Sequence, residues 1–400
     1  MFNNLMQLPT DPLLGLIERF REDANPQKID LGVGVYKNEV GETPVQQCVK
    51  LAEKFLLENE STKAYLGPMG DQLFAESMLK LAFGENHACL LDGRVAAKQT
   101  PGGCGALRVT AELIVRASPS ARVWVSNPSW ANHTPLLGNA GVKFETYPYY
   151  NFVDKGISFD EMISTLDAGA KAGDLVLLHG CCHNPCGADL NHDQWQAVAE
   201  LLKRKQLIPF VDMAYQGLAE GIEEDAYGIR LLADTLPEML LALSCSKSFG
   251  LYRERTGLAV ALTESKRNRD IANSNMVNIA RGIYSMPPSH GAATVTHILR
   301  NPHLEALWRK ELGEQRERIC YVREMFVDIM AQRGYGERFD FIGRERGMFS
   351  FLGLNLEQVQ RMINSCSVYM TDSSRISLAG LNNENIDYFC DSVVATLEAG

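Results

Sequence analysis

The sequence lacks any hydrophobic run long enough to cross a membrane. A transmembrane helix needs roughly 18 uninterrupted apolar residues, and no segment of the 400-residue chain has them. The N-terminal segment, MFNNLMQLPTDPLLGLIERF, also lacks the basic start and apolar core of a secretory signal peptide. The ten cysteines are scattered along a long chain, unlike those of a small disulfide-stabilised domain. We therefore expect a soluble, reduced, cytoplasmic protein.

Positive charge is also in short supply, since 39 lysines and arginines face 49 acidic residues and the net charge is −10. This balance argues against a general nucleic-acid binder, which needs a basic surface to displace counterions from phosphates. It leaves small anionic substrates open, because a few local arginines can bind them. The sequence also contains no internal repeat, low-complexity tract or flexible linker. Its 46% hydrophobic and 22% charged residues are typical of a globular protein.

The middle of the chain contains a regular alternation of short apolar runs and helical patterns. The helical pattern is clearest in residues 193–206, where Trp195, Val198 and Leu202 recur at helical spacing. The apolar runs are continuous, as in strands buried on both faces of a sheet. They cover residues 94–100, 122–126, 175–179, 207–212, 239–244 and 257–262. This alternation predicts an α/β fold with a mainly parallel sheet covered by helices.

The last third of the chain has a different character. A long helical pattern covers residues 301–332, as one helix or two in series. Short strands at 348–352 and 375–378 and helices at 355–364 and 382–397 follow it. Because no linker cuts the chain, we predict a smaller α+β domain built from both termini. Its expected boundaries are residues 1–43 and 314–400, and the large domain is expected over residues 44–313.

The residues that follow each predicted strand form the candidate site, because open parallel sheets bind ligands beyond the carboxyl ends of their strands. Pro-Gly-Gly-Cys-Gly at 101–105 stands between a strand and a helix. Backbone N–H groups and the helix dipole favour an anion such as a phosphate there, although an ordinary glycine-rich turn has the same pattern. Trp130 follows the next strand, where it either packs in the protein or stacks on a planar ligand.

Residues 180–187, Gly-Cys-Cys-His-Asn-Pro-Cys-Gly, permit two interpretations. Cys181, Cys182, His183 and Cys186 are metal-ligand types. Adjacent cysteines, however, rarely point at one ion, and no second C-x-x-C pair completes a familiar spacing. We therefore expect no metal site. The Asn-Pro-x-Gly turn is more informative, because it can direct the Asn184 amide toward the sheet edge.

Two further strands end in groups that can do chemistry. Asp212 closes the strand at 207–212 and Tyr215 follows it. A carboxylate at the end of a buried strand is energetically costly unless it is paired, which favours a functional role. The alternative is that Asp212 only caps the next turn. Lys247 follows the strand at 239–244. A lysine beside an apolar cleft loses proton affinity and becomes a usable amine, whereas most lysines are simply solvated.

Groups that can bind phosphate surround Lys247 in the sequence. Ser244 precedes it, and either Arg253 or Arg255 can bind a phosphate through paired hydrogen bonds. One sheet edge thus receives an amine, a carboxylate, an amide, a phenol, an indole, a glycine-rich anion site and a guanidinium. Proteins hold pyridoxal phosphate with such groups, including a Schiff-base lysine and an aspartate beside the pyridinium nitrogen.

With these residues the sequence resembles the aspartate/aromatic aminotransferases, class-I pyridoxal-phosphate-dependent enzymes of fold type I, subgroup I. The resemblance covers essentially the whole chain. Its motifs are Asp11-Pro-x-Leu-Gly-Leu, Leu31-Gly-Val-Gly-Val-Tyr-Lys37, Tyr65-Leu-Gly, Thr100-Pro-Gly-Gly-Cys-Gly-Ala-Leu107, Trp124-Val-Ser-Asn-Pro-Ser-Trp130, His179-Gly-Cys-Cys-His-Asn-Pro185, Asp212-Met-Ala-Tyr-Gln-Gly217, Ser246-Lys-Ser-Phe-Gly-Leu-Tyr-Arg-Glu-Arg255, Arg346-Gly-Met-Phe-Ser350 and Ser374-Arg-Ile. It implies a seven-stranded, mainly parallel sheet with helices on both faces.

The resemblance implies a role for each candidate residue. Lys247, Asp212 and Tyr215 would be catalytic, with Lys247 carrying pyridoxal phosphate and Asp212 pairing with its ring nitrogen. The other cofactor-binding residues would be Gly103, Cys104, Trp130, Asn184, Ala214, Ser244 and Arg255, with Tyr65 from a partner subunit. The substrate would meet Gly34, Trp130, Asn184, Arg375 at its α-carboxylate, and the partner subunit's Arg281 at its side-chain carboxylate. His133 and His179 would stand behind Asp212. Shared sites imply a homodimer.

The chain departs from the family pattern near the expected site. Cys104 and Cys186 stand where threonine or serine is usual, and a thiol is a weak hydrogen-bond donor. Ile283 and Met286 stand where asparagines are usual, near the expected side-chain pocket. In addition, Asp372 and Ser374 precede Arg375 in place of small residues. These changes bear on cofactor affinity and substrate preference more than on reaction class.

Retention of Arg281 favours ping-pong transamination of L-aspartate with 2-oxoglutarate, because a buried guanidinium without a carboxylate partner is costly. Met286 favours the alternative, an aromatic-amino-acid aminotransferase with broad dicarboxylic and aromatic specificity. A pyridoxal-phosphate-dependent β-lyase and a zinc-binding protein are the less favoured interpretations. A nucleotide-dependent enzyme is disfavoured, since residues 102–105 lack the G-x-G-x-x-G spacing.

Overall fold

The computed structural model describes residues 2–8 and 12–399. Asp11 of the first family motif therefore lies outside the described residues. The chain forms two compact units: a large unit over Pro44–Glu317, and a small unit that combines the N-terminal segment up to Thr43 with the chain from Arg318 onward. The division falls within helix α12 (Pro302–Gln332), a single helix. Among the described residues, no helix is both long and apolar enough to span a membrane.

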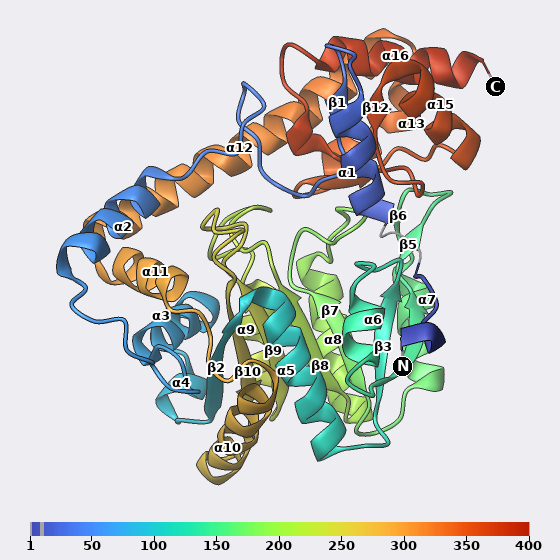
Figure 1. The fold of residues 1–400 in the computed structure, drawn as a ribbon. Helices are drawn as coiled ribbons and strands as arrows, with labels where there is room; N and C mark the ends of the chain where they lie inside the picture. The colour runs from blue at the N-terminus through green and yellow to red at the C-terminus, as the bar shows by residue number, and fades with distance from the viewer. Residues whose placement is uncertain (1, 9–11, 400) are drawn as a thin grey trace. The chain divides into compact units, whose positions relative to one another are not determined.

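The large unit is built on a seven-stranded sheet (Figure 1). Its strands are β2 (Val95–Pro101), β3 (Arg122–Asn127), β4 (Lys143–Pro148), β7 (Leu175–His179), β8 (Ile208–Met213), β9 (Met239–Ser244) and β10 (Thr256–Leu262), in the spatial order β2-β10-β9-β8-β7-β3-β4. Strand β10 is antiparallel to both of its neighbours, and the other neighbouring strands of this sheet are parallel to each other. The predicted mainly parallel, seven-stranded α/β sheet is confirmed. The apolar pattern does not reveal β4, because Lys143 and Glu145 of this edge strand are exposed.

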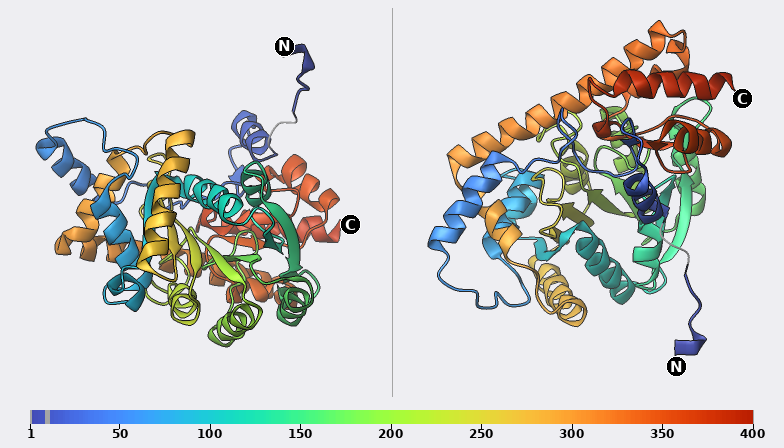
Figure 2. Two further views of the ribbon diagram at one scale, coloured as in Figure 1. Left: turned by 90° about the horizontal axis from the view of Figure 1, so that it is seen from below. Right: turned by 45° about the horizontal axis from the view of Figure 1, so that its top comes forward.

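Helices cover both faces of this sheet, as the resemblance implies. Figure 2 shows α5 (Gly102–Ala117) on one face and α8 (His192–Lys205) and α9 (Tyr227–Thr235) on the other. Helix α10 (Lys266–Ile283) packs beside α5 and β2. Helix α8 begins at a capping box formed by Asn191 and Gln194, which satisfies two free backbone N–H groups. The other helices and strands of this unit are α2 (Gln47–Asn59), α3 (Gln72–Phe83), α4 (Ala88–Leu91), α6 (His133–Gly138), α7 (Phe159–Gly169), α11 (His290–Arg300), β5 (Tyr150–Asn151) and β6 (Gly156–Ile157).

The small unit contains two short strand pairs, the first of which joins the two ends of the chain. Strand β1 (Ile29–Asp30) is parallel to β12 (Val368–Tyr369), and β11 (Phe349–Phe351) is antiparallel to β13 (Arg375–Ser377). Leu31, Phe326 and Phe389 belong to one buried apolar cluster, so the N-terminal segment shares a core with the C-terminal segments. The helices of this unit are η1 (Phe2–Asn4), α1 (Pro12–Glu22), α13 (Gly336–Phe339), α14 (Phe341–Arg344), α15 (Leu356–Cys366), η2 (Leu378–Gly380) and α16 (Ile386–Glu398).

Candidate active site

The carboxyl ends of three neighbouring parallel strands bring the central polar groups together. His179 ends β7 and lies in register with Asp212 on β8, and Asp212 lies in register with Ala242 on β9. Strand β9 then ends at Ser244, three residues before Lys247. The sheet therefore delivers a carboxylate, an imidazole and an amine to one edge, the usual ligand position in parallel sheets.

Lys247 is a partly buried amine with an unusual environment. Burial lowers its pKa below the ordinary lysine value, and the negative charge of Asp212 opposes this effect only in part. The positive charge of Arg255 lowers the pKa further. The ammonium nitrogen lies 4.9 Å from the centre of the Tyr215 ring. This environment increases the share of neutral amine, the form that acts as nucleophile or base.

Asp212 is held by a chain of hydrogen-bonding side chains behind it. His133 Nε2 lies 3.0 Å from Asp212 Oδ2, and His133 Nδ1 lies 2.9 Å from Ser129 Oγ. The same hydroxyl lies 3.2 Å from His179 Nε2. Burial alone would raise the pKa of the Asp212 carboxyl, but the hydrogen bond to His133 and the nearby positive groups outweigh it, and the pKa is lowered. The carboxylate thus stays charged at neutral pH, ready to hold a proton on a neighbouring basic nitrogen.

A cradle for an anion lies at the start of α5. A Cβ atom on Gly102 would lie 2.6 Å from Arg255 Nη2, and one on Gly103 would lie 3.1 Å from Ser244 Cβ. A side chain at either position would crowd these groups, and Gly102 also has a φ of +69°, which favours glycine. Cys104 follows on the first turn of the helix, and burial raises the pKa of its thiol, which stays neutral. Free N–H groups of the helix start and the guanidinium favour a phosphate here.

The orientation of Arg255 depends on residues that the sequence does not single out. Its Nη1 donates hydrogen bonds to Ser246 Oγ at 3.3 Å and to the Tyr252 carbonyl at 2.9 Å. Arg255 itself has a φ of +50°. These bonds fix Nη1, while Nη2 points at the glycine turn. Of the two arginines left open by the sequence, the structure brings Arg255 to the cradle.

The segment 180–187 forms a turn rather than a gathered metal-ligand set. Asp189 accepts hydrogen bonds from the backbone N–H groups of Cys182 and His183, at 2.6 and 2.8 Å. Cys186 Sγ lies 3.2 Å from His183 Nδ1, whereas Cys181 faces the sulfur of Met213. Within the described residues, no three His, Cys, Asp or Glu side chains gather in a metal-binding arrangement. The remaining predicted residues of this region, Asn184, Ala214 and Tyr215, lie at the same sheet edge, with Asn184 and Tyr215 buried.

Trp130 lies in the loop after β3, next to the side chains that hold Asp212. Its ring meets the His133 imidazole edge-on, with the ring centres 5.2 Å apart. The indole is only partly buried. It therefore packs on the histidine, as one interpretation of the sequence expects, and its stacking on a planar ligand stays a prediction.

Arg375 organises the strand pair of the small unit. Its Nη2 donates a hydrogen bond to the Gly32 carbonyl at 2.7 Å, and its guanidinium lies 4.5 Å from the centre of the Phe349 ring. A Cβ atom on Gly34 would lie 2.5 Å from Phe349 Cζ. The glycine at position 34 is therefore required by the ring that supports Arg375. The sequence marks Gly34 and Arg375 as candidates but gives no sign that Phe349 connects them.

Arg323 on α12 holds the loop that leads into Phe349. Its side chain is 2% exposed and donates hydrogen bonds to the carbonyls of Ile342, Arg346, Gly347 and Phe349 and to Ser350 Oγ. The buried carboxylate of Glu345 also bonds to Ser350 and lies 3.8 Å from the guanidinium. One buried cation thus fixes the backbone around the aromatic support of Arg375.

Tyr65 and Arg281 do not join the lysine site within this chain. Tyr65 is 88% exposed. Arg281 is exposed as well, and its Nη1 donates a hydrogen bond to Ser285 Oγ at 2.9 Å. In the described part of the chain, neither contacts Lys247 or Asp212. Both are the residues expected to act from a partner subunit.

Comparison with known proteins agrees with this geometry. The family model "Aminotransferase class I and II" matches residues 26–393. The chain is 45% identical to the aspartate aminotransferase of Escherichia coli (strain K12), over 99% of this chain and 100% of that protein. It is 42% identical to the aromatic-amino-acid aminotransferase of Pseudomonas aeruginosa, over 98% of each.

Solved structures give the same result. An aromatic-amino-acid aminotransferase from Burkholderia pseudomallei, covalently bound to pyridoxal phosphate, superimposes with a TM-score of 0.97 at 40% identity, over 99% of both chains. The cytoplasmic aspartate aminotransferase of Saccharomyces cerevisiae matches with a TM-score of 0.96 at 32% identity, over 100% of this chain and 99% of that one. The resemblance stated from the sequence is confirmed: the chain belongs to the class I and II aminotransferase family.

Proposed function

We propose that this protein is a pyridoxal-phosphate-dependent aspartate aminotransferase, which converts L-aspartate and 2-oxoglutarate to oxaloacetate and L-glutamate by a ping-pong reaction. The observation that carries the proposal is the presence at one sheet edge of Lys247, a lysine of lowered pKa, and a charged Asp212 that is backed by His133. The similarity to proteins named aspartate aminotransferase supports the same function.

The residues present fit pyridoxal phosphate. The cradle formed by Gly103, Cys104, Ser244 and Arg255 would hold the phosphate, and Lys247 would hold the aldehyde carbon. When bound, the cofactor supplies an electron-poor ring that accepts the electron pair released at the substrate Cα. Asn184 and Tyr215 would hold the ring oxygen, while Trp130 and Ala214 would enclose the ring. The charged Asp212 would favour a proton on the ring nitrogen, and its hydrogen bond with His133 would keep Asp212 in place.

Lys247 moves the proton that transamination requires. Because its pKa is lowered, its Nζ is available as a neutral amine once the substrate amine has replaced it. As a general base it would take the proton from the substrate Cα, and as a general acid it would deliver a proton to the cofactor carbon that had been bonded to Lys247. The Tyr215 ring beside Nζ limits the directions that the amine can take. Water would supply the oxygen of the released 2-oxo acid, and the amino group would stay on the cofactor. A second 2-oxo acid would then accept that amino group by the reverse sequence.

Two arginines would select the substrate. Arg375, with the adjoining Gly34 region, would bind the α-carboxylate, because a guanidinium matches a carboxylate with two parallel hydrogen bonds. Arg281 of a partner subunit would bind the side-chain carboxylate. We therefore propose a homodimer with shared sites, located in the cytoplasm. The exposure of Tyr65 and Arg281 in the single chain agrees with such an assembly.

A broad aromatic specificity is the second candidate. Ile283 and Met286 follow Arg281 closely, and Ile283 leaves 43% of its surface exposed. Apolar side chains next to a guanidinium suit an aromatic substrate as well as a dicarboxylic one. Proteins named aromatic-amino-acid aminotransferase are nearly as similar to this chain as those named aspartate aminotransferase.

The test measures kcat/KM for L-aspartate and for L-phenylalanine, each with 2-oxoglutarate as the amino acceptor. The proposal requires aspartate to be preferred by at least about 10-fold. Equal or reversed preference would move the protein to the aromatic branch. Absence of both activities in a protein loaded with pyridoxal phosphate would refute the proposed function altogether.

A further inference from the structure

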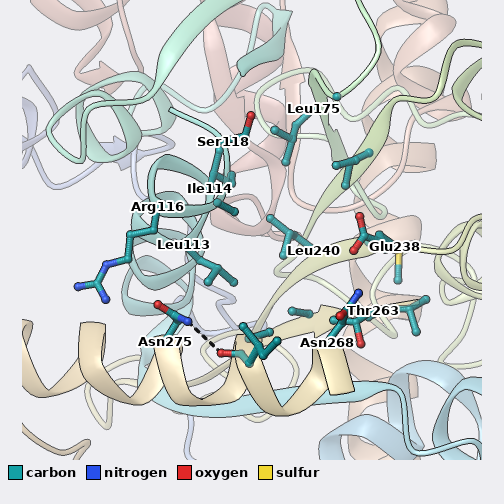
Figure 3. Close-up of a pocket in the computed structure, with 18 residues that line it drawn as sticks. Leu113, Ile114, Arg116, Ser118, Leu175, Glu238, Leu240, Thr263, Asn268 and Asn275 are labelled. Carbon is teal, nitrogen blue, oxygen red and sulfur yellow. Dashed lines mark hydrogen bonds between the residues drawn. The ribbon is translucent and has the colours of Figure 1, made fainter. Parts of the chain in front are cut away.

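A cavity of about 420 Å³ lies in the large unit at the amino ends of the parallel strands. Leu175, Ile208 and Met239, the first residues of β7, β8 and β9, line it. The lysine site lies at the opposite, carboxyl ends of the same strands. The end of α5 and the start of α10 form the other walls (Figure 3). Its volume is within the range of small-molecule sites.

The walls of this cavity are mainly aliphatic. Ile114 from α5, Leu240 from β9 and Ala272 from α10 belong to or pack against the apolar core between the helices and the sheet. Figure 3 shows Ile114 and Leu240 among the side chains that line the cavity, with Arg116 and Glu238 on opposite sides of the view. Such a surface favours a ligand with an aliphatic or aromatic body.

Several polar groups of the cavity form hydrogen bonds within the protein. Thr263 Oγ1 donates a hydrogen bond to the Arg94 carbonyl at 2.8 Å, and Asn275 Nδ2 donates one to the Ile271 carbonyl at 3.0 Å. Arg116 Nη1 donates one to Asn278 Oδ1 at 2.8 Å. Glu238, which is half-buried, has no hydrogen-bond or ion-pair partner among the described residues.

The electrostatic environment of Glu238 calls for a positive charge. Burial raises the pKa of its carboxyl, and the negative charge of Glu264 raises it further. No lysine or arginine opposes these two effects. A partly desolvated carboxylate beside another carboxylate is unfavourable until a cation pairs with it.

We propose that this cavity binds a small hydrophobic ammonium compound. Its cationic nitrogen would pair with Glu238, and its aliphatic or aromatic body would fill the space between Ile114, Leu240 and Ala272. Because the cavity and Lys247 lie at opposite ends of the strands, the compound binds at the same time as the substrate. This site is independent of the proposed function of the lysine site.

The test is calorimetric titration of the holoenzyme with N,N-dimethyl-2-phenylethylamine. This probe is protonated at neutral pH and, as a tertiary amine, cannot form an imine with the cofactor. We expect one site per chain, and Glu238→Gln should weaken binding by at least about 10-fold. The matched control is Glu264→Gln, which removes the same charge next to the cavity and should weaken binding less than about 3-fold. The anion 3-phenylpropionate should not bind to the cavity.

A second variant tests the walls. Ala272→Phe fills part of the cavity and should abolish probe binding while the oligomeric state and the aspartate kcat stay unchanged. Three results would overturn the proposal: equal probe affinity in Glu238→Gln, loss of probe binding in saturating L-aspartate, or a change of oligomeric state in Ala272→Phe. The second would assign the probe to the lysine site, and the third would assign the cavity to an interface between copies.

Discussion

Lys98 is a buried lysine in the sheet whose charge the fold does not neutralise. It lies on β2, opposite Ala259 of β10, with 0% of its surface exposed. Its Nζ has no hydrogen-bond partner among the described residues. Burial lowers its pKa from 10.5 to about 8, and no charged neighbour contributes. At neutral pH the native protein therefore carries a buried, unpaired ammonium.

The fall in the pKa of Lys98 sets how strongly its buried charge destabilises the folded state. Each pKa unit corresponds to about 1.4 kcal/mol, so the fall from 10.5 to about 8 destabilises the folded state by about 3 kcal/mol at neutral pH. The folded pKa lies below the unfolded one, so between pH 8 and 10.5 the unfolded chain binds more protons. The penalty is therefore complete below pH 8 and disappears as the pH rises toward 10.5.

The substitution Lys98→Met keeps the length of the side chain and removes the charge. We expect it to raise the free energy of unfolding by up to about 3 kcal/mol at pH 7 and by much less at pH 9.5. Urea unfolding of both proteins at both pH values measures this difference. Lys143→Met, in the exposed edge strand β4, is the matched control and should change stability by less than about 0.5 kcal/mol. A Lys98→Met variant that is no more stable than the wild type, or whose advantage does not shrink with pH, would refute the reasoning.

Three further substitutions test the cofactor and substrate supports. Gly102→Ala should raise the pyridoxal phosphate Kd at least about 10-fold, because the new Cβ would displace Arg255. Titration of the apoprotein with the cofactor measures this Kd. An unchanged Kd would contradict the proposal that the cradle binds the phosphate. Cys104→Thr should lower that Kd about 3-fold, since a hydroxyl donates a stronger hydrogen bond; a higher Kd would count against a phosphate contact there. Arg323→Met should lower the free energy of unfolding by about 3 kcal/mol. It should also raise the aspartate KM more than it lowers kcat, because Phe349 loses its support. An unchanged KM in a folded variant would show that Phe349 has no part in substrate binding.

The sequence predicts the parts of the fold that repeat a local pattern. The continuous apolar runs predict six of the seven strands of the large sheet within one or two residues, because both faces of these strands are mostly buried. It does not predict β4, since its exposed side chains hide the pattern. Nor does it show that β10 runs antiparallel, because orientation depends on how the chain returns to the sheet.

In the candidate site, too, some residues are predictable from the sequence and others are not. Asp212, Lys247 and the glycines at 102 and 103 are predictable, because each lies at or shortly after the carboxyl end of an apolar strand. Ser129, which connects two histidines behind Asp212, is not predictable, since a serine in a loop is common. The link from Arg323 to Phe349 joins residues 26 positions apart through a backbone carbonyl, which leaves no trace in the residue pattern.

The most direct test of the central claim identifies the lysine that carries the cofactor. The protein is loaded with pyridoxal phosphate, reduced with borohydride and digested, and the modified peptide is identified by mass spectrometry. The account predicts that the phosphopyridoxyl group is on Lys247 and is lost from that peptide when L-aspartate is added before reduction. A label on Lys98, the other buried lysine of lowered pKa, or a fully labelled Lys247 peptide in the presence of aspartate, would contradict it.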